Sequence, residues 1–284
     1  MLGAQCARLN RHRCSESSIY LDPVLPQVQN PVDPLLRVIC RTGLARACCR
    51  VFGVLFLLSG FAAMGSAAED AAWPDPERYR DVMEAWALVT VPKRALVAVG
   101  SSSMRFWSLG DRFAKDFAPI TTVNRGFGGS VMNDVAYFLD EAVLALEPRA
   151  VMIYEGDNDL SRGISPDAII SSLRGIIARL HAHNPEIRVY VFSVKPSLAR
   201  ASLWPLMQVL NQSYESLAQS DERITYVNVA AAMLKDSDWL NPDLFIADGL
   251  HLSAAGYDVW RQVVRQTIVP IERPFERAYL EASK

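Results

Sequence analysis

Short runs of apolar residues alternate along this chain with longer segments of helical periodicity. Five runs of mainly small or branched apolar residues predict strands, at residues 95–99, 120–123, 150–154, 187–193 and 224–229. Apolar positions at helical spacing predict helices at residues 73–91, 134–146, 166–183, 203–219 and 254–269. Strands separated by helices of this length form a parallel sheet with helices on both faces. The pattern therefore predicts one α/β domain, which we place at residues 69–284.

A different pattern precedes this domain. Residues 51–68 begin with an apolar run after Arg46 and Arg50 and end in small residues that include Ser66 and Ala68. A basic flank, a short apolar core and small residues at the −3 and −1 positions are typical of a secretory signal peptide. The run is shorter than the roughly 20 residues of a membrane span. We therefore predict a signal peptide that exports the domain to the periplasm or out of the cell, with an uncleaved membrane anchor as the alternative.

The first 50 residues differ in charge from the rest of the chain. They hold seven arginines, no lysine and three acids, a net charge of +4, whereas the remainder carries 22 basic and 28 acidic side chains, a net charge of −6. A net-acidic domain without a long basic run argues against a nucleic-acid-binding face. All five cysteines also lie in residues 1–50, so the exported domain is expected to fold without disulfides. Residues 1–50 are interpreted as a disordered extension or as an over-extended start site.

Four polar stretches fall where predicted strands end or where the last helix begins. They are Gly100–Ser103, Asn124–Ser130, Glu155–Asp159 and Ala247–Ser253. In a parallel α/β sheet, reactive side chains and backbone N–H groups gather on loops beyond the carboxyl ends of the strands. Taken alone, the three serines after Gly100 could simply cap a helix. Together, the four stretches are expected to lie on one rim of the sheet.

The last of these stretches contains a candidate base for a serine. Asp248 precedes His251 by three positions, a spacing that lets one turn present a carboxylate and an imidazole together. The carboxylate would hold one ring nitrogen while the other takes the proton of a serine hydroxyl, which is a poor nucleophile without a base. His181 and His183 end a predicted helix and are interpreted as surface residues. The alternative for Asp248 and His251 is a solvated loop at the start of a helix.

The two middle stretches offer hydrogen-bond donors for a developing oxyanion. Gly129 has no side chain, so its backbone N–H can approach a substrate closely, and Asn158 offers a side-chain amide after a central strand. A glycine-rich turn and an Asn/Asp turn are the structural alternatives. The glycines lack the lysine and the spacing of phosphate-binding loops. Asp157 and Asp159 without further ligands are weak support for a metal, so we expect neither a metal nor a cofactor.

In this order, the four stretches resemble the four sequence blocks of the SGNH hydrolases, the GDSL-type esterase and lipase superfamily, over nearly all of residues 95–270. Residues 100–107 are similar to a branch whose first block is Gly-Ser-Ser-Ser-(Ile/Met)-Arg-x-Trp. The resemblance implies a three-layer α/β/α sandwich of flavodoxin-like type with a five-stranded parallel sheet.

The resemblance also implies a role for each site residue. Ser102 stands at the nucleophile position, and Asp248 with His251 matches the Asp-x-x-His dyad. The N–H of Ser102, Gly129 and the Asn158 amide stand at the oxyanion positions.

One position departs from the family pattern. The Asp of Gly-Asp-Ser is Ser101 here, which leaves Ser101 and Ser103 open as alternative nucleophiles. The superfamily includes lipases, thioesterases, carbohydrate esterases and acyltransferases, so the resemblance does not select a substrate.

The sequence thus predicts a serine ester hydrolase for small acyl esters, possible substrates being O-acetyl groups on carbohydrate, because no long apolar insertion could form a lid. An acyltransferase with the same site and a non-catalytic binding module are the alternatives. Arg105 could bind a substrate carboxylate or phosphate, although pairing with Asp157 or Asp159 is favoured. Trp204 is expected at the entrance of the pocket.

Overall fold

The computed structural model describes residues 74–234 and 240–282. The predicted extension at 1–50, the signal or anchor segment at 51–68 and the five cysteines lie outside the described residues. Within the described part of the chain, no helix combines the length and the apolar character that crossing a bilayer requires.

Five parallel strands form one sheet, as the alternating pattern predicted. The strands are β1 Leu96–Gly100, β2 Thr122–Gly126, β3 Ala150–Tyr154, β4 Arg188–Phe192 and β5 Ile224–Val227. Their order is β2-β1-β3-β4-β5, with all pairs parallel. The central strands β1 and β3 are buried at every position, which explains their unbroken apolar sequences. This is the flavodoxin-like order, in which the strand order reverses between β1 and β3 and ligands bind at the carboxyl ends there.

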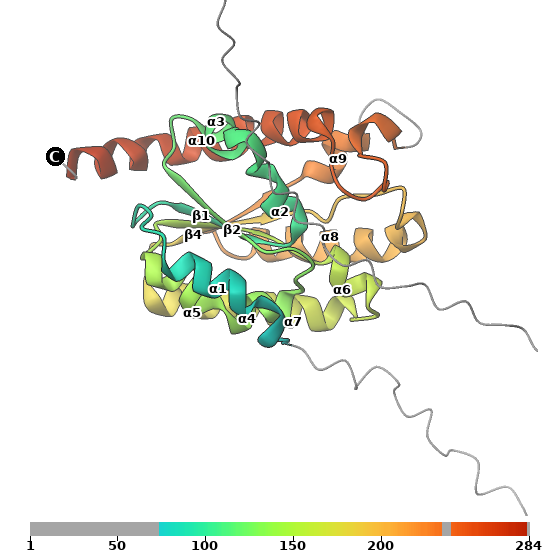
Figure 1. Cartoon of the computed structure of the whole chain (residues 1–284), viewed down its shortest axis with the longest axis horizontal. Coiled ribbons are helices and arrows are strands. Elements are labelled where there is room, and N and C mark those ends of the chain that lie inside the picture. Colours follow the sequence, from blue (N-terminus) through green and yellow to red (C-terminus); the bar gives the residue numbers. More distant parts are fainter. Residues whose placement is uncertain (1–73, 235–239, 283–284) are drawn as a thin grey trace, which may run out of the picture. The chain divides into compact units, whose positions relative to one another are not determined.

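Helices cover both faces of the sheet, which completes the predicted three layers. The α-helices are α1 Arg80–Ala87, α2 Ser102–Trp107, α3 Arg112–Phe117, α4 Met132–Tyr137, α5 Leu139–Ala142, α6 Asp157–Ser161, α7 Pro166–His183, α8 Trp204–Gln219, α9 Val229–Leu234 and α10 Ala254–Ala282. The 3-10 helices are η1 Glu77–Tyr79, η2 Leu109–Asp111, η3 Leu144–Leu146, η4 Ala201–Leu203 and η5 Pro242–Leu244. Figure 1 shows the sheet between a layer with α1, α4, α5 and α7 and a layer with α3, α9 and α10. A buried apolar cluster fills the space on each face.

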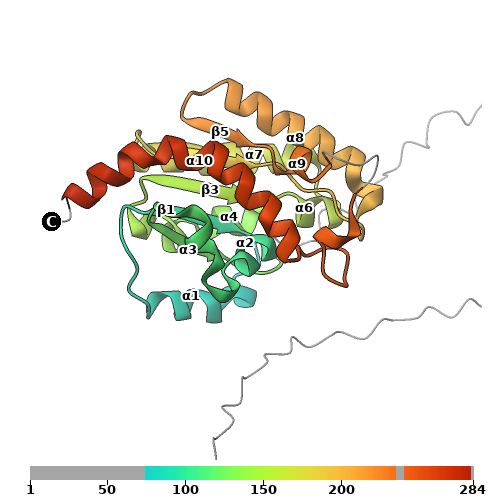
Figure 2. The ribbon, with the colours of Figure 1, turned by 90° about the horizontal axis from the view of Figure 1, so that it is seen from above.

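The last helix is longer than the sequence predicted. The expected end at residue 269 is wrong, because α10 runs through Pro270 and Pro274 to Ala282 and crosses the strands (Figure 2). Proline normally ends a helix because it lacks an N–H and clashes with the preceding turn. Here the continuation carries Glu272 and Glu276, whose carboxylates are bound by side chains at the amino ends of the strands.

Other boundaries also differ from the predictions. The helix expected at 73–91 is confined to α1 after the short η1, and the one at 134–146 is divided into α4, α5 and η3. The second strand was expected at 120–123 but runs over Thr122–Gly126. β2 is an edge strand, paired only with β1 in this sheet. An edge strand can contain polar residues, so the search for an apolar run did not find its second half.

Candidate active site

Ser102 lies where β1 turns into α2 at the carboxyl edge of the sheet. Gly100 ends β1 with φ +142°, and a β-carbon at this position would lie 2.2 Å from the carbonyl oxygen of Tyr154 on β3. Only glycine allows this conformation and this close approach of the two strands. The flanking Ser101 and Ser103 are 1% and 2% exposed, whereas Ser102, the first residue of α2, is half-buried. Of the three serines, Ser102 is therefore the one whose hydroxyl can meet both a base and a substrate.

A continuous line of hydrogen bonds joins Ser102 to the loop before α10. The His251 nitrogen Nε2 lies 2.9 Å from Oγ of Ser102, and Nδ1 lies 2.5 Å from Oδ2 of Asp248. The other carboxylate oxygen of Asp248 accepts hydrogen bonds from the backbone N–H groups of Leu250 and His251, at 2.8 and 2.9 Å. With its Nδ1 hydrogen directed to the carboxylate, the imidazole presents Nε2 as an acceptor for the serine proton.

The surroundings of Asp248 and His251 favour this arrangement. Partial burial by itself raises the pKa of Asp248, but the hydrogen bonds from the His251 ring and from the two backbone amides hold this pKa below its usual value. The carboxylate therefore stays ionised at neutral pH and keeps the imidazole in one tautomer. The ring of Phe106, one turn after Ser102 on α2, contacts the imidazole with 4.9 Å between ring centroids.

The glycine-rich stretch and Asn158 lie next to each other, as the sequence predicted for one rim. The Asn158 amide nitrogen donates to the carbonyl oxygen of Ser130 at 2.9 Å, and its oxygen accepts from Arg200 at 2.9 Å. An amide carries two hydrogens, so one N–H of Asn158 remains for another acceptor. Gly129 has φ +77°, its carbonyl accepts from Arg162 at 2.8 Å, and a β-carbon here would lie 2.4 Å from Nη2 of Arg78.

Two cations that the sequence analysis did not assign to the site hold Asn158 and its neighbour. Lys195, only 1% exposed, lies 3.3 Å from Oδ2 of Asp157, and Arg200 lies at the same distance from that oxygen. Burial favours a raised pKa for Asp157, yet the two cations lower it below its usual value. Both cations lie on the loop after β4, so the rule that loops at the carboxyl ends carry the site could have found them.

Two further predictions for this rim can be compared with the geometry. The expected ion pair between Arg105 and Asp157 or Asp159 is wrong: Asp157 is paired with Lys195 and Arg200, while Asp159 accepts backbone N–H groups. Arg105 is exposed instead and lies over the glycine-rich stretch, with Nη1 3.0 Å from the position of a β-carbon on Gly128.

Trp204 begins α8 and lines a pocket of about 250 Å³ with Tyr226 and Asn228. Tyr226 lies in β5 and Asn228 directly follows this strand, whereas Ser102 follows β1. The structure thus places Trp204 in a pocket toward the β5 side of the same rim. Among the described residues, no group of three or more potential metal-ligating side chains is found.

The strand order and the hydrogen-bonded line from Asp248 through His251 to Ser102 define an α/β protein with a candidate catalytic serine at the carboxyl edge of its sheet. Residues 98–259 match the GDSL-like Lipase/Acylhydrolase family. The chain therefore belongs to this family, and the match runs from within β1 to the second turn of α10.

Solved structures support the fold. The chain is 23% identical to a GDSL-like lipase from Bacteroides thetaiotaomicron, with a TM-score of 0.56 and coverage of 68% of this chain and 97% of that one. A lipase/acylhydrolase from Enterococcus faecalis is 19% identical, with a TM-score of 0.53 and coverage of 62% and 96%. A mutant form of an acetyl-xylooligosaccharide esterase from Geobacillus is 19% identical, with a TM-score of 0.52 and coverage of 62% and 95%. No curated protein sequence matches the chain.

Proposed function

We propose that this protein is a serine ester hydrolase in which Ser102 is the nucleophile, His251 the general base and Asp248 the residue that orients it. The observation that carries this proposal is the unbroken contact from Asp248 through His251 to Ser102, at 2.5 and 2.9 Å. In the first step, Oγ of Ser102 attacks the ester carbonyl carbon while its proton passes to Nε2 of His251. The imidazolium then protonates the leaving alcohol, and water releases the acid from Ser102 by the same route.

The oxyanion that forms in each step needs donors in a fixed position. We assign this role to the N–H groups of Ser102 and Gly129 and to the Asn158 amide. Ser102 is the first residue of α2, so its N–H has no partner within that helix. Asn158 is held by Arg200 and Ser130 and is 8% exposed, so its amide is already oriented before substrate arrives.

For the substrate, we propose small acyl esters, with O-acetyl groups on carbohydrate as the first class to test. Two facts support this: no long apolar insertion interrupts the domain sequence, and a neighbour in fold is described as an acetyl-xylooligosaccharide esterase. Arg105, exposed beside Gly128, is the proposed contact for an anionic group on the substrate. Trp204 is the proposed wall of an extended sugar site on the β5 side of the rim. We also assign the chain to the branch with the Gly-Ser-Ser-Ser-(Ile/Met)-Arg-x-Trp first block.

The experiment that tests this function is hydrolysis of p-nitrophenyl acetate, butyrate and decanoate and of acetylated xylo-oligosaccharides by the full chain. We expect activity on the short esters, and a loss of about three to six orders of magnitude in kcat for Ser102→Ala and His251→Ala. Ser101→Ala and Ser103→Ala are matched controls that should retain the activity. An active Ser102→Ala protein would show that the nucleophile is assigned wrongly.

The same assay separates the two alternatives. Acylated sugar formed when acceptors are added, with slow release of free acid, would favour an acyltransferase. A folded parent that binds acetylated oligosaccharide, hydrolyses none of the esters and binds equally well as Ser102→Ala would favour a binding module.

We further propose that residues 51–68 direct export of the domain. The support is the sequence pattern of this segment alone. Expression of the full chain in a bacterial host, followed by cell fractionation and amino-terminal sequencing, tests it. A periplasmic or secreted product that begins at Glu69 is expected; a full-length product in the membrane fraction would indicate an anchor.

A further inference from the structure

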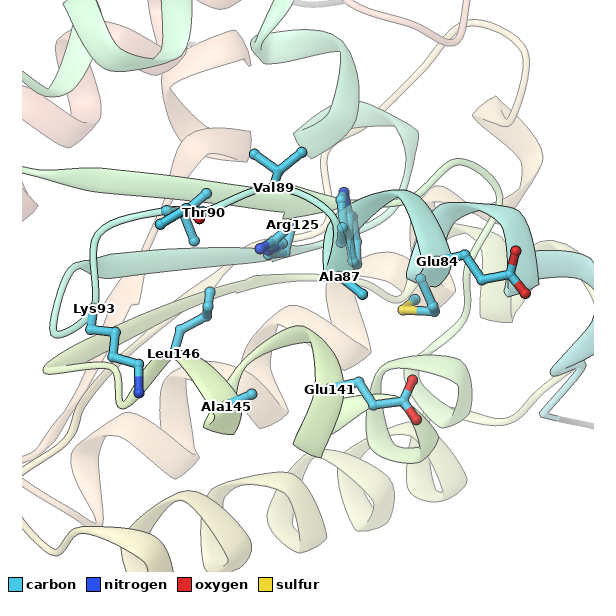
Figure 3. A pocket seen from close by; sticks show the side chains of 12 residues that line it. Glu84, Ala87, Val89, Thr90, Lys93, Arg125, Glu141, Ala145 and Leu146 are labelled. Atoms are coloured by element: carbon cyan, nitrogen blue, oxygen red, sulfur yellow. The ribbon is translucent and has the colours of Figure 1, made fainter.

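A second pocket lies on the opposite face of β2 from α2 and encloses an unusual cation. It has a volume of about 580 Å³ and is bordered by α1, the segment that follows it, α5 and η3. Figure 3 shows Arg125 at its centre, between Ala87 of α1 and Leu146 of η3. This volume is within the range of roughly 300–1,000 Å³ that is typical of small-molecule sites.

Arg125 is almost fully buried and has no anionic partner among the residues that the structure describes. Its side chain points from β2 toward α1, is 5% exposed, and forms no hydrogen bond or ion pair with any residue that the structure describes. The only interaction of its guanidinium there is stacking on Trp86, with Cζ 4.9 Å from the ring centroid. Stacking covers one face of the guanidinium and leaves the N–H donors in its plane unused. Burial also lowers the pKa of Arg125, as expected when a charge is removed from water without compensation.

A buried charge without a partner is costly, since removing it from water costs several kcal/mol and only a well-placed counter-ion offsets this. The unused donors of Arg125 match the two oxygens of a carboxylate. The other charged side chains of the lining do not supply that anion. Lys93 is exposed and pairs with Glu147, and Glu84 and Glu141 are exposed and point away from Arg125 in Figure 3.

Apart from Thr90, the rest of the lining is apolar. Trp86, Val91 and Leu146 form walls beside the guanidinium, and Met83 and Ala145 continue them. One buried cation amid apolar walls matches a ligand with one negative charge and an apolar body. The two negative charges of a phosphate would be opposed by one buried cation and would lie near the acids Glu84 and Glu141. The charge balance of the pocket therefore favours a monoanion.

We propose that this pocket binds a monocarboxylate with an aliphatic tail, the carboxylate pairing with Arg125 and the tail lying against Trp86, Val91 and Leu146. The site is separate from Ser102, and its occupation does not depend on the proposed esterase activity. It is nevertheless connected to the glycine-rich stretch, because Arg125 precedes Gly126, and Trp86 contacts Phe127 with 6.0 Å between ring centroids.

Binding of octanoate to the full chain, measured by calorimetry, tests this proposal. 1-Octanol serves as the neutral counterpart and inorganic phosphate as the free anion. We expect saturable one-to-one binding of octanoate, affinity at least tenfold lower for octanol, and none for phosphate. Arg125→Met, which removes the charged guanidinium and keeps an unbranched apolar side chain, should lower octanoate affinity at least tenfold and leave octanol unchanged. Lys93→Met is the matched control at the rim and should bind octanoate like the parent.

A direct readout does not depend on the variants. The Nε–H resonance of Arg125 should shift on titration with octanoate and not with octanol. The proposal is wrong if octanoate fails to bind, if octanol binds as tightly, or if Arg125→Met retains the octanoate affinity. If Arg125→Met does not fold, two measurements on the parent protein still test the proposal. They are the comparison of octanoate with octanol and the shift of the Arg125 Nε–H resonance. Tight phosphate binding would overturn the proposed monocarboxylate in favour of a phosphate site.

Discussion

At the amino ends of the strands, the buried carboxylate of Glu272 has two cationic partners, Arg188 at 2.7 Å and Arg149 at 3.4 Å. At the carboxyl ends, the buried Asp157 also has two cationic partners, Lys195 and Arg200. In each cluster a buried carboxylate is paired with two cations. They differ in what they connect.

The amino-end cluster connects secondary-structure elements to each other. It consists of Thr121, Arg149, Arg188, Tyr190, Glu272 and Glu276, which come from the starts of three strands and from α10. Both oxygens of Glu272 and both of Glu276 accept hydrogen bonds from this set. These hydrogen bonds all join α10 to the residues at the starts of the strands, so the role of the cluster is to hold α10 against the sheet.

The carboxyl-end cluster connects the scaffold to a reactive position. Arg200 bonds to both Asp157 and Asn158, and Asn158 keeps one amide hydrogen free of the partners described here. Burial of ion pairs thus serves stability at one end of the sheet and positioning at the other. The predictions below separate these two uses of charge.

The largest effect is expected for Asp248→Asn. An asparagine amide can donate to Nδ1 and so stabilise the wrong imidazole tautomer, which should lower kcat about 10⁴-fold, by analogy with the serine protease case. Ester hydrolysis by the purified full chain measures it. Asp243→Asn, in the preceding 3-10 helix η5, is the control and should keep full activity. A loss below tenfold for Asp248→Asn would refute the orienting role.

Glu272→Gln is expected to affect stability and not catalysis. Removing the anion leaves Arg188 and Arg149 less than fully paired in a buried site, so the free energy of unfolding should fall by about 3–5 kcal/mol. Urea unfolding measures the loss, and kcat/KM per folded molecule should equal that of the parent. Glu281→Gln on the exposed end of α10 is the matched control. A drop in kcat/KM without a loss of stability would contradict the division between the two clusters.

Asn158→Ala should show the reverse behaviour. Loss of one oxyanion donor costs about 10²–10³-fold in kcat in serine hydrolases, and KM should change little. Steady-state kinetics with p-nitrophenyl acetate provides the measurement. Asn184→Ala, at the carboxyl end of α7, removes an amide away from the site and is expected to leave kcat intact. Equal effects of the two substitutions would show that Asn158 is structural.

Per pH unit, Asp159 should make the smallest contribution to stability. Burial raises its pKa from 3.8 to about 7, so the folded protein keeps this proton between about pH 4 and 7 while the unfolded chain releases it. Stability should therefore fall as the pH rises through this window and level off above it, by at most about 1.4 kcal/mol per pH unit. Asp159→Asn should flatten this slope in urea unfolding from pH 4.5 to 7.5, whereas the exposed Asp167→Asn should not. Identical slopes for Asp159→Asn and the parent would disprove the shift.

The buried strands and the helices α7 and α8 could be predicted from the sequence because their patterns are local. Ala150–Tyr154 and Pro166–His183 were predicted to the residue, since a run of apolar residues and a Ser-Pro-Asp start are determined by neighbours along the chain. The end of β2 was missed, because Asn124 and Arg125 carry no apolar signal and their strand conformation depends on pairing with β1.

The site shows the same division. The sequence by itself determined which stretches would meet at the rim, because a parallel sheet places every strand end on one side, and it named Ser102, Asp248 and His251 as candidates. Only the tertiary structure decided that Ser102 and not Ser101 or Ser103 reaches His251, and that Lys195 and Arg200 rather than Arg105 neutralise Asp157. It alone carried α10 through two prolines and left Arg125 buried beside Trp86. These outcomes depend on contacts between residues far apart in the chain, and such contacts leave no periodicity in the sequence.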